Sequence, residues 1–477
     1  MAEYEPVIGL EIHVQLQTRT KMFCGCELSF GDPPNTHTCP VCLGLPGALP
    51  VINEQAVRYA TMIGLAFECE IARRSLFHRK NYFYPDSPKG YQISQYDEPI
   101  CRGGRLDDVR IHRAHLEEDA AKLEHVSESG RIHGAERSVV DFNRCGTPLV
   151  EIVTEPDVRS PEHAREWLTL LRATLKALGV SDVDMSQGSL RVDANVSVRR
   201  VGTPELGVKT ELKNMNSFRF LERGIKAEVE RQVKLLKSDG AVELETLHFD
   251  PATGNLTPLR SKEEAHDYRY FPEPDLMPLE VSDDLFASAR DALPELPAAR
   301  ADRFESELGL PAARARELAF RGELGDYFER VVAASSDGPT PSELANWIPQ
   351  LVERIGSDAD PASSRVSPES IATLAAMVHA REVSRDAARE VLTRLVSEGG
   401  DARAIIETED LGALGDDGAL GEIVDRALAS DPSAAESVRV GNERALGPLV
   451  GYVMRETKGR ADGGEVRRLI LERLGAE

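Results

Sequence analysis

The sequence of 477 residues lacks several features that would assign it to a class at once. No apolar run approaches the ~20 residues that a membrane-spanning helix needs, so no membrane partner is expected. Residues 1–5 are acidic, and no basic and apolar segment of a secretory signal follows them. These absences predict a cytoplasmic protein.

Two catalytic motifs are also missing. The pattern G-x-x-x-x-G-K-[ST] does not occur, so any bound ATP is not held by a P-loop. The pattern G-x-S-x-G is absent as well, and we find no Ser-Lys or Cys-His arrangement suited to hydrolysing glutamine. If this protein transfers ammonia, another protein must produce it.

Aromatic residues are scarce at 5%, and lysine is absent between Lys262 and Lys458. The hydrophobic content of 41% still suffices for globular cores, and the length predicts two to four of them. The net charge of -23 opposes nonspecific binding of nucleic acid. Because the acid is spread along the chain, it also fits adaptation to a salty cytoplasm. Charge therefore neither supports nor excludes a tRNA partner.

The composition changes along the chain. Residues 1–294 combine strand and helix patterns, whereas helical spacing of Ala, Arg, Glu and Leu begins after Pro294. A second break, rich in Gly and acid, falls near residues 399–410. We predict an α+β protein in which a mixed domain (1–294) precedes two all-helical domains (295–405 and 406–477).

Three strands and one helix are expected around the candidate site. Residues 7–16 and 189–199 alternate apolar and polar side chains, as half-buried strands do. Residues 149–153 form a shorter apolar strand with Glu151 at its centre. Between them, a helix capped by Ser160 carries one apolar stripe and ends at Gly179.

Four of the seven cysteines cluster near the N-terminus. Cys24 and Cys26 form one close pair, Cys39 and Cys42 form a second, and a short loop joins them. Two such knuckles satisfy tetrahedral Zn²⁺ and leave no open position for catalysis, so we interpret the cluster as a structural zinc site. The alternative is a set of free buried thiols.

Ionisable side chains interrupt the predicted strands. Glu11 and His13 project to the same side of one strand, residues 115–119 hold four ionisable groups, and Glu151 lies in an apolar run. Carboxylates in such places are costly unless they are paired or bind a cation. If the fold brings them together, they would hold a divalent metal such as Mg²⁺. A solvated polar sheet face is the alternative.

Residues 79–86 (RKNYFYPD) place cations beside three aromatic rings in a Pro-bounded segment. Arg79 and Lys80 would contact phosphate oxygens there, and an aromatic ring would stack on a base. An amphipathic strand with its aromatic side chains packed inward explains the same pattern.

Taken together, these segments resemble the B subunit of the glutamyl/aspartyl-tRNA amidotransferase over the whole chain. The matching stretches are VIGLEIHVQL (7–16), RKNYFYPDSPKGYQISQYD (79–97), HLEEDA (115–120), GTPLVEIVTEPD (146–157), SLRVDANVSVR (189–199), ELKNMNSF (211–218) and DYRYFPEPD (267–275). The resemblance implies a cradle-shaped catalytic domain, a helical domain and a small tail related to the YqeY family.

The resemblance also implies an activity and partners. The B subunit is a ligase that uses ATP to phosphorylate the side-chain carboxylate of Asp-tRNA(Asn) or Glu-tRNA(Gln) during protein biosynthesis. Ammonia, which an amidase A subunit releases from glutamine, then displaces the phosphate, and a small C subunit completes a heterotrimer.

The family's site residues map onto this sequence. Its Mg²⁺ ligands correspond to His13, Glu118 and Glu151, with Glu11 close by, and its phosphate-facing loop corresponds to Lys80 and Asn81. Because histidine is an atypical Mg²⁺ ligand, the identity of the metal stays open. Further residues are expected to line the same cleft: Arg191, Asp193, Asn195, Lys213 and Asn214.

Three alternatives remain. A related archaeal subunit serves an enzyme restricted to Glu-tRNA(Gln), but it carries an inserted domain for which this chain is short. A tRNA-binding scaffold without catalysis is the second, and a zinc-dependent hydrolase is the third. The choice between Asp-tRNA(Asn) and Glu-tRNA(Gln) stays open; an archaeal halophile would favour Asp-tRNA(Asn).

Overall fold

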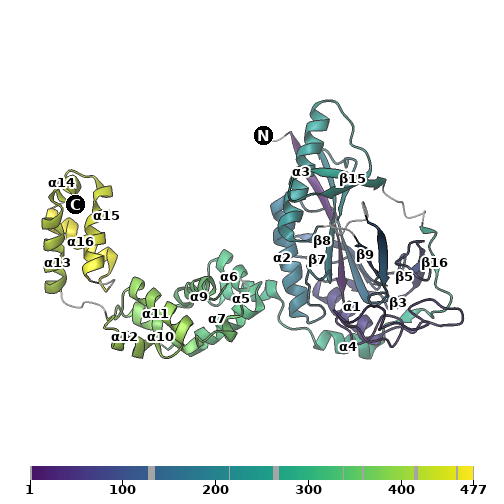
Figure 1. Cartoon of the computed structure of the whole chain (residues 1–477), viewed down its shortest axis with the longest axis horizontal. Helices are drawn as coiled ribbons and strands as arrows, with labels where there is room; N and C mark the ends of the chain where they lie inside the picture. The colour runs from purple at the N-terminus through teal and green to yellow at the C-terminus, as the bar shows by residue number, and fades with distance from the viewer. Residues whose placement is uncertain are drawn as a thin grey trace. The chain divides into compact units, whose positions relative to one another are not determined.

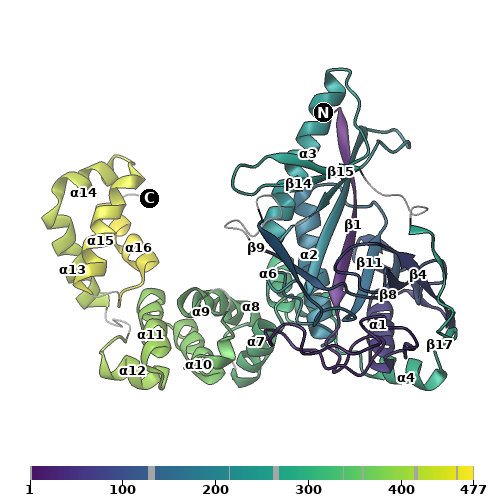
Figure 2. The ribbon, with the colours of Figure 1, turned by 45° about the vertical axis from the view of Figure 1, so that its right-hand side comes forward.

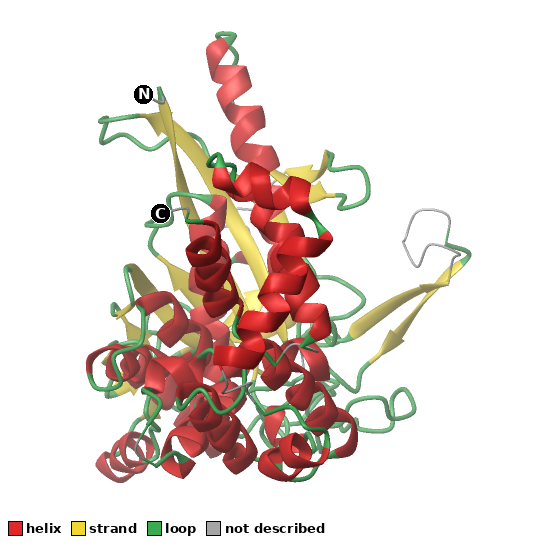
Figure 3. Cartoon of the chain, turned by 90° about the vertical axis from the view of Figure 1, so that its left-hand side faces the viewer, coloured by secondary structure: helices red, strands yellow, loops and turns green. Residues whose placement is uncertain are grey.

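The computed structural model describes residues 3–126, 135–213, 215–261, 268–336, 338–356, 359–412, 417–457 and 460–475. The chain divides into two compact units, residues 1–298 and 299–477. All named strands of the described chain lie in the first unit. Figure 3 distinguishes the strands from the helices by colour. The predicted class, a mixed sheet with helices followed by a helical region, is confirmed.

The first unit is built on a thirteen-stranded sheet. Its main path runs β15-β14-β13-β12-β1-β11-β8-β5-β4-β16, in which only the β13–β14 pair is parallel. The strands are β1 Tyr4–Gln15, β2 Glu70–Ile71, β3 Arg74–Ser75, β4 Phe77–Asn81, β5 Tyr91–Gln95, β6 Cys101–Arg102, β7 Arg105–Leu106, β8 Val109–Glu118, β9 Lys122–Val126, β10 Arg137–Asp141, β11 Pro148–Thr154, β12 Leu190–Arg200, β13 Thr210–Lys213, β14 Glu245–Phe249, β15 Leu256–Ser261, β16 Phe271–Pro272 and β17 Leu279–Glu280. Strands β9 and β10 form a separate hairpin, and β3 pairs with β17.

Helices cover one face of this sheet. The first unit holds α1 Glu54–Ala66, α2 Pro161–Ala177, α3 Phe218–Lys237 and α4 Asp283–Asp291. Figure 1 shows α2 and α3 along one side of the strands. The Oγ1 of Thr210 on β13 donates to the carboxylate of Glu228 on α3 over 2.7 Å, which fixes the face that α3 contacts. The apolar side chains of β1 and β12 lie on this helix-covered face and are buried.

The predicted elements around the site are confirmed with small shifts of their ends. The strand expected at 7–16 is β1, that at 189–199 is β12, and that at 149–153 is β11. The N-cap of α2 is Ser160, whose side chain accepts from the backbone N–H of His163, and a proline follows in the first turn. Strand β1 lies between β11 and β12, so the N-terminal strand is central in the sheet (Figure 2).

The named elements of the second unit, in its described residues, are all helices. It holds α5 Pro297–Ser306, α6 Ala312–Ala319, α7 Gly322–Ala334, α8 Pro341–Ala345, α9 Trp347–Ile355, η2 Pro361–Ser363, α10 Pro368–His379, α11 Arg385–Glu398, α12 Ala402–Thr408, α13 Asp417–Ser430, α14 Pro432–Arg439, η3 Glu443–Ala445, α15 Leu446–Glu456 and α16 Gly463–Leu474. Its buried apolar side chains form two clusters, within residues 301–411 and 420–474. The predicted boundaries at 294 and 405 stay predictions. No described helix is long and apolar enough to span a bilayer.

Candidate functional site

The polar face of the sheet carries a row of ionisable side chains across four adjacent strands. His13 on β1 pairs with Glu151 on β11 on one side and with Arg191 on β12 on the other. Glu151 in turn pairs with His115 on β8. Because directly opposed residues of antiparallel strands point to the same face, these four side chains lie side by side.

Three of the polar side chains converge closely enough to share a cation. Nε2 of His13 lies 3.5 Å from Oε2 of Glu151 and 3.7 Å from Oε1 of Glu117. One possible ligand atom from each residue lies within 4.8 Å of the others. Ligands of an octahedral Mg²⁺ are ~2.1 Å from the ion, hence ~3–4 Å from their neighbours. The residues therefore fit a hard divalent cation.

The third member of this group differs from the prediction. The sequence analysis placed Glu118 beside His13 and Glu151, but the residue that joins them is Glu117. Glu118 lines the same cleft as His13, but it does not join the close group of His13, Glu117 and Glu151, because successive side chains of β8 point to opposite sides. Its carboxylate instead forms an ion pair with Lys89 and accepts the backbone N–H of Ile93 over 3.0 Å. A ligand role for Glu118 is therefore not retained.

Burial and mutual charge tune the cluster. Burial and the neighbouring charge of Glu151 raise the pKa of Glu117. Burial also tends to raise the pKa of Glu151. Interactions with His115, His13 and Lys80 outweigh burial and hold this pKa well below its usual value. Burial lowers the pKa of His115 to about 4, so its imidazole is neutral at pH 7. Burial tends to lower the pKa of the proposed ligand His13, but Glu151 and Glu117 outweigh it and raise that pKa. Because metals bind neutral imidazole and ionised carboxylates, a cation at this cluster would displace protons from it.

A cleft opens beside this cluster. Its volume is about 760 Å³, within the range of small-molecule sites, and its lining includes His13 and Glu117. Four cationic side chains also line it: Lys80, Lys89, Arg191 and Lys213. Burial alone would lower the pKa of Lys80, but the charges of Glu117 and Glu151 reverse the effect and raise it. Lys80 is therefore protonated at neutral pH, as a phosphate-binding lysine must be.

Several cleft residues are held by carboxylates. Arg191 donates to Asp119 over 3.1 Å, and Lys213 donates to Asp193 over 2.7 Å. Burial tends to raise the pKa of Asp119, but Arg191 and Arg144 outweigh it, and the pKa is lowered. These pairs fix the positions of the cations before any ligand arrives, which lowers the entropy cost of binding.

Not every residue predicted for the cleft lines it. Arg191, Asp193 and Lys213 do. Asn195 instead donates to Glu11 over 2.7 Å on the same sheet face. Asn214 lies outside the described residues.

The two residues predicted to face phosphate, Lys80 and Asn81, have different surroundings. Lys80 lines the cleft. The Nδ2 of Asn81 donates to the backbone oxygens of Tyr268 and Arg269, over 3.0 and 2.9 Å. These two bonds occupy both of its amide hydrogens.

The sequence analysis included Glu117 and Asp119 within residues 115–119 without singling them out, and it did not name Lys89. For Glu117 a signal existed: it lies two residues after His115, so in a strand the two share a face. The partners of Lys89 and Asp119 depend on loops and on strand register, and no local pattern reveals them.

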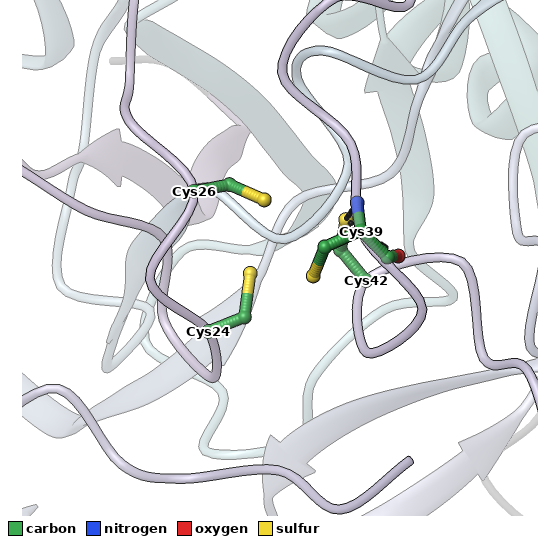
Figure 4. Close-up of side chains that lie close together, drawn as sticks. All are labelled: Cys24, Cys26, Cys39 and Cys42. Atoms are coloured by element: carbon green, nitrogen blue, oxygen red, sulfur yellow. Dashed lines mark hydrogen bonds between the residues drawn. The ribbon is translucent and has the colours of Figure 1, made fainter.

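The four predicted zinc ligands converge. The sulfurs of Cys24, Cys26, Cys39 and Cys42 lie within 4.8 Å of one another (Figure 4). Four thiolates at ~2.3 Å from a tetrahedral Zn²⁺ are ~3.8 Å apart, so the residues fit this ion. A hydrogen bond from Cys24 lowers the pKa of Cys42 to about 4, helped by the backbone N–H of Cys39.

One lysine accompanies the cysteine cluster. Lys21 is 1% exposed, and its ammonium donates to the backbone oxygens of His37 (2.8 Å) and Phe142 (3.2 Å) and to the sulfur of Cys42 (3.6 Å). A buried cation beside four cysteines is favourable when the cysteines are thiolates.

Comparison with known proteins first gives the class. Residues 6–287 match the family described as the GatB/GatE catalytic domain, and residues 326–474 match the family described as the GatB domain. The first description names two kinds of protein, GatB and GatE. Relatives that match over the full length distinguish between them.

Curated relatives extend over the whole chain. A protein of Frankia casuarinae, named as the B subunit of aspartyl/glutamyl-tRNA(Asn/Gln) amidotransferase, is 51% identical over all of this chain and 96% of its own length. A protein of the same name from Moorella thermoacetica is 48% identical over 99% of this chain and all of its own length. The chain belongs to the family of aspartyl/glutamyl-tRNA(Asn/Gln) amidotransferase B subunits.

Proposed function

We propose that this protein phosphorylates the side-chain carboxylate of Asp-tRNA(Asn), Glu-tRNA(Gln) or both with ATP, and then amidates it with ammonia. The observation that carries the proposal is the convergence of His13, Glu117 and Glu151 beside a cleft lined by four cations. The family supports it, because its members are named for amidation of these aminoacyl-tRNAs.

The reaction needs activation because a free carboxylate is a poor electrophile whose leaving group would be oxide. Transfer of the γ-phosphoryl group of ATP to a carboxylate oxygen gives an acyl phosphate and ADP. Attack by ammonia on the acyl carbon then expels phosphate, and the nitrogen loses a proton as the amide forms.

We assign His13, Glu117 and Glu151 to a divalent cation, Mg²⁺ by the chemistry of nucleotides. When bound, the cation would neutralise charge on the phosphates. Lys80 and Arg191 would contact phosphate oxygens, since both are cationic and line the cleft. Asp119 and Asp193 keep Arg191 and Lys213 in place through the ion pairs described above.

We assign Zn²⁺ to the four cysteines as a structural ion, because a closed four-thiolate site leaves no coordination position for a substrate. Ammonia would come from an amidase A subunit that hydrolyses glutamine, with a small C subunit completing the complex. Support for such partners comes from the relatives, whose name is that of one component of a larger enzyme.

The decisive experiment uses the assembled complex with ammonium chloride as the nitrogen donor, which bypasses the amidase. ATP labelled in the γ-phosphate and each misacylated tRNA are supplied, and the acyl phosphate, ADP and amide are measured. Glu151→Gln is expected to lower the rate of phosphorylation ~10²–10³-fold, because an electrostatic catalytic group contributes about this much. Glu155→Gln is the control, since Glu155 follows the same strand but pairs with His112 at the surface.

A tRNA-binding scaffold would give another result. If the protein were a scaffold, it would bind both misacylated tRNAs. A complex that carries Glu151→Gln would then form the amide as fast as the unaltered complex. That outcome, or the absence of ATP consumption with either tRNA, would refute the proposed function.

A further inference from the structure

Residues 268–275 cross the edge of the sheet next to the metal-binding cluster, and we call them the strap. Strand β16 pairs with β4, with Phe271 opposite Arg79. The backbone N–H of Glu273 donates to Phe77 over 2.8 Å. The strap thus joins the strand that carries Lys80, although nearly two hundred residues separate the two segments.

The far end of the strap is clamped by Arg79. Its Nε and Nη2 donate to the two carboxylate oxygens of Glu273, each over 2.7 Å, and Nη2 also reaches Asp275 at 3.1 Å. The guanidinium lies 4.2 Å from the ring centre of Tyr91. The carboxylate of Glu273 is fully buried, and a paired, bidentate carboxylate in such a place holds its segment firmly.

The near end is clamped by Asn81. Its two bonds to the backbone oxygens of Tyr268 and Arg269 hold a strained turn, because Arg269 has a φ of +49°. Residues other than glycine seldom adopt this conformation unless their surroundings impose it, and such residues cluster at functional sites. Asn81 therefore holds the backbone of the strap in place.

The held turn carries two tyrosine rings, one of which contacts Lys80. The ring centre of Tyr268 lies 4.7 Å from the ammonium of Lys80. The ring of Tyr270 stacks on Tyr96 at 4.1 Å and 6°, and it meets the ring of Tyr268 edge to face at 6.0 Å. Burial, with the charges of Glu117 and Glu151, raises the pKa of the Tyr270 hydroxyl well above its ordinary value. Tyr268 therefore contacts the lysine that lines the cleft, and Tyr270 and Tyr96 extend this ring surface behind it.

We propose that the rings of Tyr268 and Tyr270 form an aromatic wall beside Lys80 that excludes water from the acyl phosphate, and that Asn81 is the residue that positions this wall. The inference rests on the proposed function. It removes Asn81 from the phosphate contacts that the family resemblance implied and gives it an indirect role.

The chemistry explains why such a wall is needed. Water that attacks the acyl phosphate expels phosphate and restores the carboxylate, so one ATP is spent and no amide forms. Ammonia must reach the same carbon first. A wall of apolar ring surface beside a fixed lysine lowers the local concentration of water while it leaves the phosphoryl transfer intact.

The test measures the number of ADP molecules formed per amide in the assembled complex, with ATP, misacylated tRNA and ammonium chloride. The unaltered complex is expected to form about one ADP per amide. Tyr268→Ala is expected to raise this ratio about tenfold, because it removes the ring that contacts Lys80 and opens the wall. Tyr268→Phe keeps the ring and should keep the ratio near one.

Asn81 is tested by rescue. Asn81→Leu has a similar shape but cannot donate to the two strap carbonyls, so it should raise the ratio as Tyr268→Ala does. Adding Arg269→Gly to Asn81→Leu should bring the ratio back toward one, since glycine adopts a positive φ without strain. A structural defect at Asn81 would not be cured by a change at residue 269.

Three results would overturn the inference. One is a ratio near one for Tyr268→Ala, and another is no rescue by Arg269→Gly. The third is an equal loss of ADP and amide in Tyr268→Ala, which would make the ring part of the phosphorylation step. Failure of the proposed function is distinguishable, because the unaltered complex would then consume no ATP with either tRNA.

Discussion

The substitution Lys21→Met tests the assignment of zinc to the cysteine cluster. Methionine is close to lysine in length and apolar, so it fills the same buried space without the charge. A Zn²⁺ ion with four thiolates carries a net charge of about -2. The ammonium of Lys21 is the cation that donates to one of these sulfurs, so its removal should weaken zinc binding.

The magnitude follows from the distance. Unit charges 3.6 Å apart attract by ~4–5 kcal/mol at an effective dielectric constant of ~20. Much of this is offset, because methionine avoids the cost of burying an ammonium. Removal of a group that contacts a metal ligand typically costs ~10–100-fold in affinity. We therefore expect zinc to bind ~10–100-fold more weakly to Lys21→Met.

The assay is competition with a coloured zinc chelator at pH 7.5, with the bound metal measured by elemental analysis. Lys122→Met is the matched control, because Lys122 lies at the surface and pairs with Glu124. Its zinc affinity should equal that of the unaltered protein. If Lys21→Met bound zinc within twofold of the unaltered protein, the electrostatic argument would be refuted.

Two further predictions concern the stability of the first unit, and both use the Trp347→Phe background so that Trp167 alone reports on this unit. Ile12→Ala should lower the free energy of unfolding by about 3–5 kcal/mol, because Ile12 is 0% exposed on the central strand, whereas Val201→Ala at a 54% exposed position should change it by less than ~0.5 kcal/mol. A smaller loss for Ile12→Ala, measured in urea, would contradict the central place of β1. Because the pKa of Asp119 is lowered below 3.8, its carboxylate stabilises the fold fully above about pH 4, and this contribution is lost as the pH falls further. The difference in unfolding free energy between the unaltered protein and Asp119→Asn should thus be largest at pH 7 and shrink below pH 4, and a constant difference would contradict it.

Strict alternation was enough to predict strands β1 and β12, since a period of two has no other explanation over ten residues. Ser160 and the proline after it located the start of α2 for a similar reason, because caps act locally. The four cysteines were also found from spacing alone. In each case the physical cause lies within one short segment.

The choice between Glu117 and Glu118 illustrates what local patterns leave open. Alternation along the strand groups Glu117 with His115 and separates both from Glu118, but which of the two faces meets His13 and Glu151 depends on the register between β8 and β11. The contact of Asn81 with Tyr268 and Arg269 is harder still, since it joins segments nearly two hundred residues apart. Long-range pairing of this kind leaves no trace in periodicity.

The central position of β1 also has a consequence for synthesis on the ribosome. This strand leaves the exit tunnel well before its two neighbours, which lie at residues 148–154 and 190–200. At a translation rate of ~5–20 residues per second, its apolar side chains stay unpaired for ~10–40 s, until both neighbouring strands have been synthesised. Early chaperone contact with the nascent chain, or slow elongation, should therefore decide the yield of folded protein more than the final stability does.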